Sequence, residues 1–339
     1  MRRRRRLVLR SLLAAGLVAA AYAWAVPQVA SYGSVGDTLA TVSAGWAAAL
    51  AAAAVLDVLT SSLPWRVLLP QLSWLDTIGF TQASTSLQTF VPGGAPVGMA
   101  ISFGLLRRLR VGAGAAGFAI ALVGIWGQVT ILLYPVAGLL LVLATGRLTG
   151  TVVAIAGASG GAALVAGLVA AAALRSRRIA ARLAERAHRA AEALARLTRR
   201  DRPAWDAKAL LRLRDERLGL LRRRWPALTA MTLANQLAAY LVLELSLRAV
   251  GIPVRQLPPA ETFLAWAIGR VLASLPLTPG GIGIVELGLI GTLVGFGGGH
   301  ARVVSAVLLY RALIVLPTLL AGGLAFLGWR LAGPRAAAP

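Results

Sequence analysis

Long apolar runs constrain this chain more than any other feature. Several are long enough to cross the roughly 30 Å hydrocarbon core of a bilayer as helices. Lipid offers the backbone no hydrogen-bond partner, and these runs of Ala, Leu and Val lack the alternation of barrel strands. The sequence therefore predicts an all-α, polytopic integral membrane helical bundle. The uninterrupted runs are Leu12 to Val26, Thr38 to Val58, Ala115 to Thr145, Thr151 to Leu174, Leu228 to Val250 and Val303 to Leu327.

The net charge of +23 is typical of nucleic-acid binding, but the arginines collect outside the apolar runs, so we expect no nucleic-acid partner. One cluster is Arg2 to Arg6 with Arg10, and the segment 175–224 holds 17 Lys and Arg against 6 Asp and Glu. The positive-inside rule places both on the cytoplasmic side of the cell (plasma) membrane. The basic start and the apolar stretch after it also resemble a signal peptide, and we expect an uncleaved first span.

The segment 175–224 divides the chain into two membrane halves. We expect an N-terminal half over 1–174 with a broken helix at about 77–106, and a C-terminal half over 225–339 with a broken helix at about 258–300. The number of crossings in 112–174 is two or three. Apolar residues scattered among the arginines indicate amphipathic surface helices in the bridge. It is a loop that touches anionic headgroups or, alternatively, a regulatory or partner site.

The two halves resemble each other. A shift of 187 positions places Pro92, Gly93 and Gly94 on Pro279, Gly280 and Gly281, and it also superposes Asp57 on Glu244 and Gly112 on Gly299. Paired segments interrupted by Gly and Pro are typical of transporter repeats. With the basic clusters inside, the two broken segments open from opposite sides, which predicts an inverted repeat of re-entrant or broken helical hairpins.

The second break lies in the run from Ser274 to Glu286, which cannot continue a regular helix because of its prolines and glycines. Such backbone is tolerated in a membrane only where it is buried in protein or lines a wet cavity. The helix restarting near Ile282 directs its N-terminus toward that cavity, which suits an anion such as a lipid phosphate. The break at Phe90 to Gly98 predicts the same from the opposite leaflet.

Charged residues flank the second break. Two interpretations of Arg270, Glu286, Tyr310 and Arg311 remain open. Glu286 caps its own helix and pairs with an arginine, or the arginines bind a phosphate while Glu286 takes a cationic headgroup group or a proton. Asp57 and Glu244 lie near span ends, where solvation at the interface is expected. The predicted binding set also includes the glycines and prolines of the breaks, namely Pro92, Gly93, Gly94, Pro279, Gly280 and Gly281.

The motifs of several enzyme classes do not occur. There are two histidines and no cysteine, so we expect no metal site and no other cofactor. The single lysine, Lys208, is not in a phosphate loop, and there is no Gly-x-Ser-x-Gly elbow. The sequence therefore predicts a non-enzyme without catalytic residues.

The run from Leu275 to Glu286, followed by Gly297, Tyr310, Arg311 and Pro317, resembles the transmembrane region of the lysylphosphatidylglycerol synthase family, a flippase-like group. The first break, with Phe103-Gly104 and Arg107-Arg108 after it, is similar to a variant in that family. The resemblance covers about residues 10 to 330. It implies two re-entrant breaks that face a central cavity open to lipid.

The family resemblance implies translocation of a phospholipid or glycolipid between leaflets, with anionic or phosphate-bearing lipids as partners. Full-length synthases add a soluble aminoacyltransferase domain that this sequence lacks, so lysine transfer is expected to be absent. The commoner form of the first break carries an acid and an arginine close after its glycines. In this sequence that stretch holds Ala95, Pro96, Val97 and Met99, so a polyprenyl-linked or glycosylated lipid is as consistent with the sequence as an aminoacylated lipid. The alternatives are a non-catalytic accessory or scaffold for a lipid or cell-envelope enzyme, and a lipid-modifying transferase.

Overall fold

The structure is a computed structural model that describes residues 42–90, 94–143, 207–274 and 281–331, together with scattered positions between 154 and 192. Within these ranges the regular elements are helices, so the prediction of an all-α fold is confirmed. The first expected span and the run Thr151 to Leu174 lie largely outside the described residues, as do Pro92, Gly93, Pro279 and Gly280. The prediction of a cytoplasmic N-terminus concerns undescribed residues as well.

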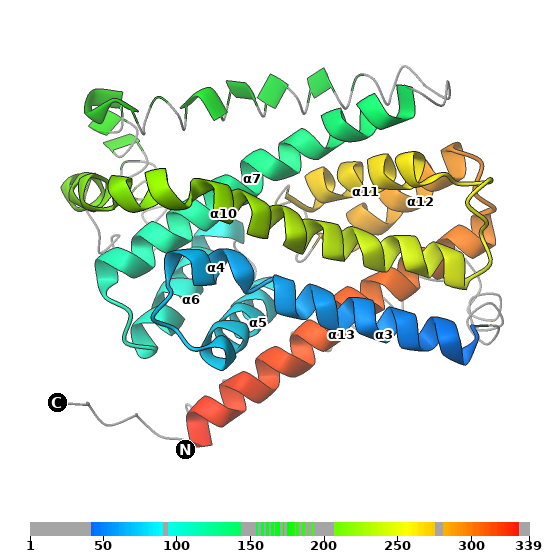
Figure 1. Cartoon of the computed structure of the whole chain (residues 1–339), viewed down its shortest axis with the longest axis horizontal. Coiled ribbons are helices and arrows are strands. Elements are labelled where there is room, and N and C mark those ends of the chain that lie inside the picture. The colour runs from blue at the N-terminus through cyan, green and yellow to red at the C-terminus, as the bar shows by residue number, and fades with distance from the viewer. Residues whose placement is uncertain are drawn as a thin grey trace.

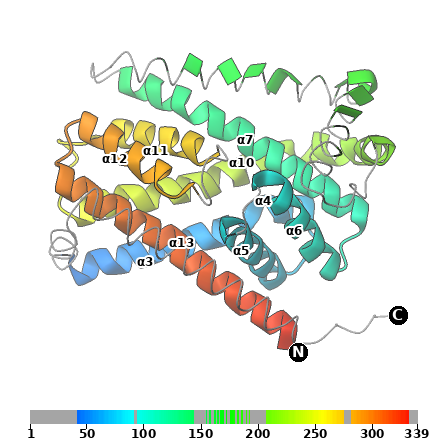
Figure 2. The same ribbon diagram turned by 180° about the vertical axis from the view of Figure 1, so that it is seen from behind.

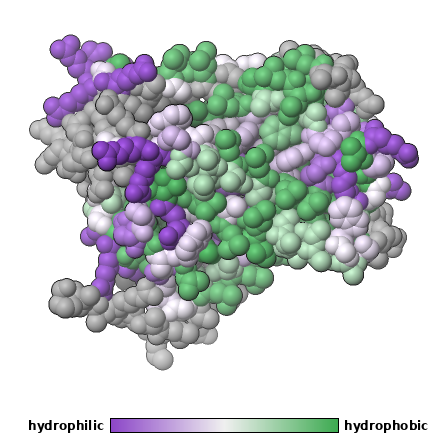
Figure 3. Space-filling view, viewed as in Figure 1, coloured by the Kyte–Doolittle hydropathy of each residue, from purple (hydrophilic) through white to green (hydrophobic). Residues whose placement is uncertain are grey.

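Four described helices are long and apolar enough to cross a membrane: Ala44–Leu68, Ala113–Leu143, Arg223–Ala249 and His300–Ala325. The first joins α3 (Ala44–Thr60) and α4 (Leu63–Leu68), and the second is α7 (Ala113–Leu143). The others belong to α10 (Ala207–Ala249) and α13 (His300–Leu331). Figure 3 shows the expected consequence, an apolar band between two more hydrophilic ends.

The helix α7 is continuous although it contains Pro135. The sequence left open whether the Tyr134-Pro135 step divides this run into two crossings. The structure has one helix there, because a proline removes a single backbone donor and neighbouring helices in a membrane protein can compensate. Pro135 is buried in the protein rather than exposed to lipid.

The helix α10 begins in the basic segment and continues into the membrane without interruption, over 43 residues. It lies beside α3, as both views show (Figures 1 and 2). Trp126 of α7 donates to the Thr229 hydroxyl of α10 over 3.0 Å, and Arg224 of α10 donates to the Val67 carbonyl of α4 over 2.6 Å. These bonds fix α10 to the N-terminal half.

Two pairs of shorter helices complete the fold. α5 (Trp74–Phe90) is followed by α6 (Gly94–Arg108), and α11 (Pro259–Ser274) is followed by α12 (Ile284–Gly295). The first pair lies toward one end of the molecule and the second toward the other (Figure 1). None of these four helices reaches the roughly 20 residues that a full crossing needs, since they have 17, 15, 16 and 12 residues.

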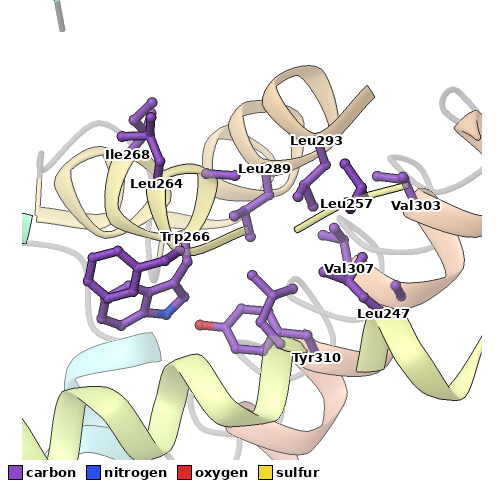
Figure 4. Close-up of a cluster of buried hydrophobic side chains, with 14 of the residues drawn as sticks. Leu247, Leu257, Leu264, Trp266, Ile268, Leu289, Leu293, Val303, Val307 and Tyr310 are labelled. Atoms are coloured by element: carbon purple, nitrogen blue, oxygen red, sulfur yellow. The ribbon is translucent and has the colours of Figure 1, made fainter. Parts of the chain in front are cut away.

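The buried apolar side chains form two clusters. The larger one surrounds α11 and α12 and includes Trp266, Leu289 and Val307 (Figure 4). The smaller one surrounds α5 and α6 and includes Phe80 and Leu106. Each pair of short helices therefore has its own packed surroundings.

Candidate functional site at the second break

The helices α11 and α12 form an antiparallel hairpin. A Cβ atom on Gly269 would lie 3.0 Å from the Leu289 side chain, and one on Gly288 would overlap Leu272, so the two helices pack closely on either side of the break. Gly281 and Gly283 adopt φ values of +68° and +83°, in the region that favours glycine. The hairpin thus depends on glycine both for close packing and for the turn into α12.

Glu286 sits in the first turn of α12 and uses both carboxylate oxygens. Oε2 accepts from the backbone N–H of Gly283 over 2.7 Å, and Oε1 accepts from Arg311 Nε of α13 over 2.7 Å. Both residues are buried, with 7% and 9% of their surface exposed. These contacts match the first interpretation of Glu286, as a helix cap paired with an arginine.

Arg270 lies near the end of α11, before the break, and its partners differ from those of Arg311. The residue is partly buried, and its buried Nε atom has no hydrogen-bond partner within the described ranges. It interacts electrostatically with Asp57 of α3 and with the hydroxyls of Tyr134 and Tyr310. Arg270 is therefore balanced by a carboxylate that does not hold it in a fixed bonded geometry.

Tyr310 connects these groups. It is buried, and its hydroxyl interacts with Arg270, Arg311 and Asp57. In Figure 4 the hydroxyl points toward the indole of Trp266. Rings from α7, α10 and α11 pack around Trp266, with centroid separations of 5.3 Å to Tyr134, 5.8 Å to Tyr240 and 5.6 Å to Phe263. These rigid rings form one wall beside the charged groups.

The first hairpin is lined by short polar side chains. The Ser84 and Ser102 hydroxyls of α5 and α6 lie 2.6 Å apart, and Gln88 donates to Ser84 over 2.8 Å. Gly94 begins α6. Toward α3, Gln82 donates to the Ser61 hydroxyl over 2.8 Å and to the Val58 carbonyl over 3.3 Å. Val58 follows Asp57, so this polar helix adjoins the charged groups around Arg270.

The expected site residues fall into two sets. Arg270, Gly281, Glu286, Tyr310 and Arg311 gather around the second break, as described above. The prolines and remaining glycines of the breaks lie outside the described residues, apart from Gly94. From the sequence we expected Asp57 to be solvated at the membrane interface. Tyr134 and Trp266 were not predicted as site residues. An acid in an apolar run was the available signal for Asp57, since such residues usually face the bundle interior.

The expectation for Glu244 is corrected as well. It does not rely on interfacial solvation, because Arg248 binds it at 2.5 Å and the Thr262 hydroxyl donates to it over 2.6 Å. Arg248 also donates to the carbonyls of Ile252 and Leu257, which closes the connection between α10 and α11. Acid and base four residues apart on one helix are neighbours, and this spacing was the missed signal.

The described charges around the break balance one another: Asp57 and Glu286 are acidic, and Arg270 and Arg311 are basic. No group of three or more His, Cys, Asp or Glu suitable for a metal occurs in the described part of the chain. The arrangement places two arginines, two acids, tyrosine hydroxyls and aromatic rings around the second break.

The helices and the buried charges define a multi-pass α-helical membrane protein. The chain matches the lysylphosphatidylglycerol synthase TM region over residues 9–322 and belongs to that family. The resemblance inferred from the break motifs is thereby confirmed. A comparison with curated proteins found no match.

Proposed function

We propose that this protein translocates a phosphate-bearing phospholipid or glycolipid between the leaflets of the cell membrane, without catalysis. Its family links it to lipid and cell-envelope function. The observation that carries the proposal is Arg270, a partly buried arginine just before the second break, whose buried Nε has no hydrogen-bond partner among the described residues. Intramembrane charges of this kind mark substrate pathways.

In this proposal Arg270 binds the phosphate and the Tyr310 hydroxyl donates to it. The ion pair between Glu286 and Arg311 holds α12 against α13, so it positions the hairpin and completes the charge balance. The N–H of Gly283 is already bonded to Glu286, so in this proposal the phosphate contacts the guanidinium of Arg270 rather than that N–H.

Opposed access supports the same function. The pairs α5–α6 and α11–α12 lie toward opposite ends of the molecule (Figure 1), as expected for an inverted repeat with its binding site between the halves. With the basic bridge cytoplasmic, α5–α6 opens toward the cytoplasm and α11–α12 toward the outside. Lipid then reaches the charged groups from either leaflet in turn.

Leaflet exchange in liposomes tests the proposal. Fluorescent phosphatidylglycerol, phosphatidylcholine and a glycolipid are followed with wild type and with Arg270→Ala, Glu286→Ala and Arg311→Ala. We expect wild-type exchange of a phosphate-bearing lipid and loss in Arg270→Ala. Arg302→Ala is the control, because Arg302 is exposed and lies outside the site. No exchange in wild type contradicts translocation, and unchanged exchange in all three variants contradicts the assignment of the site to these residues.

A second candidate is an accessory protein that recruits a lipid enzyme through the basic bridge. The continuity of α10 from residue 207 into the membrane favours it, since a partner bound there would be coupled to the bundle. Deleting residues 176–222 separates the two functions. If the deletion variant still exchanges lipid, translocation by the membrane region is supported. If the protein keeps its function when the breaks are substituted but loses it on deletion of the bridge, recruitment is supported.

A further inference from the structure

Four arginines lie around the apolar cluster that surrounds α5 and α6. Each donates one N–H to a backbone carbonyl, and all four carbonyls belong to residues of that cluster or to residues packed against it. The bonds are 2.6 to 2.8 Å long and run from Arg66 to Leu72, from Arg107 to Val111, from Arg108 to Trp329 and from Arg224 to Val67. We call these four arginines the basic collar. Because their acceptors share one cluster, the four side chains lie at the same end of the molecule.

The carbonyls do not neutralise the collar. A guanidinium has five N–H donors, so a bond to a single carbonyl leaves it further donors and its whole positive charge. Among the described residues no carboxylate forms a salt bridge with any of the four arginines. The acid of α5, Asp76, lies in the first turn of that helix and accepts from the Ser73 hydroxyl over 2.8 Å. The collar is therefore a concentration of positive charge that the described residues leave unbalanced.

Two tryptophans place the collar at the depth of lipid headgroups. The guanidinium of Arg66 lies 4.5 Å from the ring centroid of Trp74, and Trp225 directly follows Arg224. Both tryptophans are about half exposed, at 48% and 52%. Exposed tryptophans of membrane proteins gather at the interface between hydrocarbon and water. Hydrophilic residues also border the apolar band at the end where α4 and α6 lie (Figures 1 and 3). The collar thus lies at the level of the phosphates of the adjoining leaflet.

We propose that the basic collar binds the phosphates of anionic lipids in the adjoining leaflet, as lipids that stay bound to the protein rather than as transported cargo. An arginine fork matches the oxygens of a phosphate and forms short, charge-assisted hydrogen bonds with them. The carbonyls bound by the collar belong to the connection after α4, to the connection after α6 and to the end of α13. A lipid held here stabilises all three segments together. The proposal goes beyond translocation and does not depend on it, because Arg270 lies outside the collar.

The opposite end of α13 offers a matched pair of arginines. Arg302 is exposed and also donates to a single carbonyl, that of Gly251, over 3.3 Å. Arg255 is exposed in the connection between α10 and α11. Arg302 lies in the first turn of α13 and Trp329 near its last residue, so this pair and the collar lie at opposite ends of one helix. Each arginine beside an anionic surface raises the affinity for it by roughly fivefold, so removal of two collar arginines should lower it by about 25-fold.

Native mass spectrometry of the purified full chain in detergent counts the lipids that stay bound. Phosphatidylglycerol and phosphatidylcholine with identical acyl chains are added in equal amounts, and the ratio retained is measured. We expect wild type to prefer phosphatidylglycerol strongly. The double variant Arg107→Gln with Arg108→Gln should lose most of this preference, whereas Arg255→Gln with Arg302→Gln should keep it. Arg107→Lys with Arg108→Lys should keep most of it, because the charge is retained. Arg270→Ala should keep it as well, since the collar is unchanged.

The other outcomes overturn the proposal. Wild type without a preference, or equal losses in the two glutamine variants, excludes binding at the collar. Equal losses in the lysine and glutamine variants of the collar would assign the effect to packing instead of charge. Loss in Arg270→Ala alone would place the anionic lipid at the second break and support the proposed function instead. Preference for phosphatidylglycerol without leaflet exchange in wild type supports the collar and contradicts translocation.

Salt provides a test that needs no variant, so the proposal stays open to refutation even if the collar variants do not fold. Added salt weakens the attraction between exposed arginines and phosphates by screening it. The preference of wild type for phosphatidylglycerol should therefore fall as the salt concentration rises, while binding of phosphatidylcholine changes little. A preference that salt does not reduce would show that uncharged parts of the lipid are recognised, and it would overturn the role of the collar.

Discussion

Arg311 binds Glu286 at 2.7 Å, and two turns further along the same helix the Thr318 carbonyl accepts from Ser86 of α5 over 2.8 Å. α13 therefore contacts the second hairpin through an ion pair and the first through a hydroxyl. The two contacts place both hairpins along one helix, with Arg311 near the level where α5 ends.

Removal of one partner of this ion pair should destabilise the protein strongly. Glu286→Ala leaves Arg311 buried without its carboxylate and frees the Gly283 N–H, at a cost of about 3–5 kcal/mol. Glu286→Gln keeps the side-chain volume and one of the two acceptor oxygens, so it should cost less than alanine. Thermal unfolding in detergent measures the loss of stability in the two variants. A larger loss in Glu286→Gln than in Glu286→Ala would contradict this prediction.

The double variant Glu286→Gln with Arg311→Met distinguishes positioning from transport. Replacing a buried pair by neutral groups of similar volume is often close to neutral for stability. If stability and leaflet exchange both return, the pair only positions α12. If stability returns and exchange does not, the charges themselves take part in lipid movement.

Two adjacent glycines of α13 provide a matched comparison. A Cβ on Gly322 would meet Ser86 and lie 2.6 Å from the Gln82 carbonyl of α5, whereas a Cβ on Gly323 has nothing within 4 Å. Gly322→Ala should destabilise the protein by about 1–3 kcal/mol, because backbone cannot move aside easily. Gly323→Ala should have little effect. Equal unfolding midpoints for the two variants would disprove this packing.

The close contacts of Gly138 and Gly288 should respond differently to the same substitution. A Cβ on Gly138 would lie 2.9 Å from the Leu264 backbone, but one on Gly288 would meet the end of the Leu272 side chain. Gly138→Ala should therefore destabilise more, since Leu272 can rotate. Adding Leu272→Ala should restore the unfolding temperature of the Gly288→Ala variant. The same addition should not restore that of Gly138→Ala.

Labelling of single cysteines tests the opposed hairpins. The chain has no cysteine, so there is no background, and Gly112 and Gly299 are exposed with open space at the Cβ position. Gly112→Cys and Gly299→Cys should react with an impermeant maleimide from opposite sides of sealed vesicles. Reaction from the same side would exclude the inverted arrangement.

Much of the fold follows from the sequence because membrane helices need long apolar runs. α7, the membrane part of α10 and α13 lie where uninterrupted runs predicted them, and both short-helix pairs surround the predicted Pro-Gly-Gly steps. The polar face of α5 was not singled out, although Gln82 and Ser84 inside a bilayer must find partners. That signal was available without any structure.

The different surroundings of Asp57 and Glu244 could not be derived in this way. Hydropathy and the internal repeat locate each residue on its own helix, but they carry no information on which helices become neighbours or how they are rotated. Asp57 superposes on Glu244 in the repeat, yet Glu244 binds Arg248 four residues later on its own helix, whereas Ser61 stands four residues after Asp57. Equivalent positions in the two halves thus have different partners.

The length of α10 has a mechanical consequence. A helix rises about 1.5 Å per residue, so 43 residues form a rod of roughly 65 Å. One end carries the basic segment, and the other is clamped to the start of α11 by Arg248. Pro226 is a place where such a rod can bend. A displacement of the basic segment is therefore either taken up by bending at Pro226 or carried along α10 to the start of α11, the helix that holds Arg270.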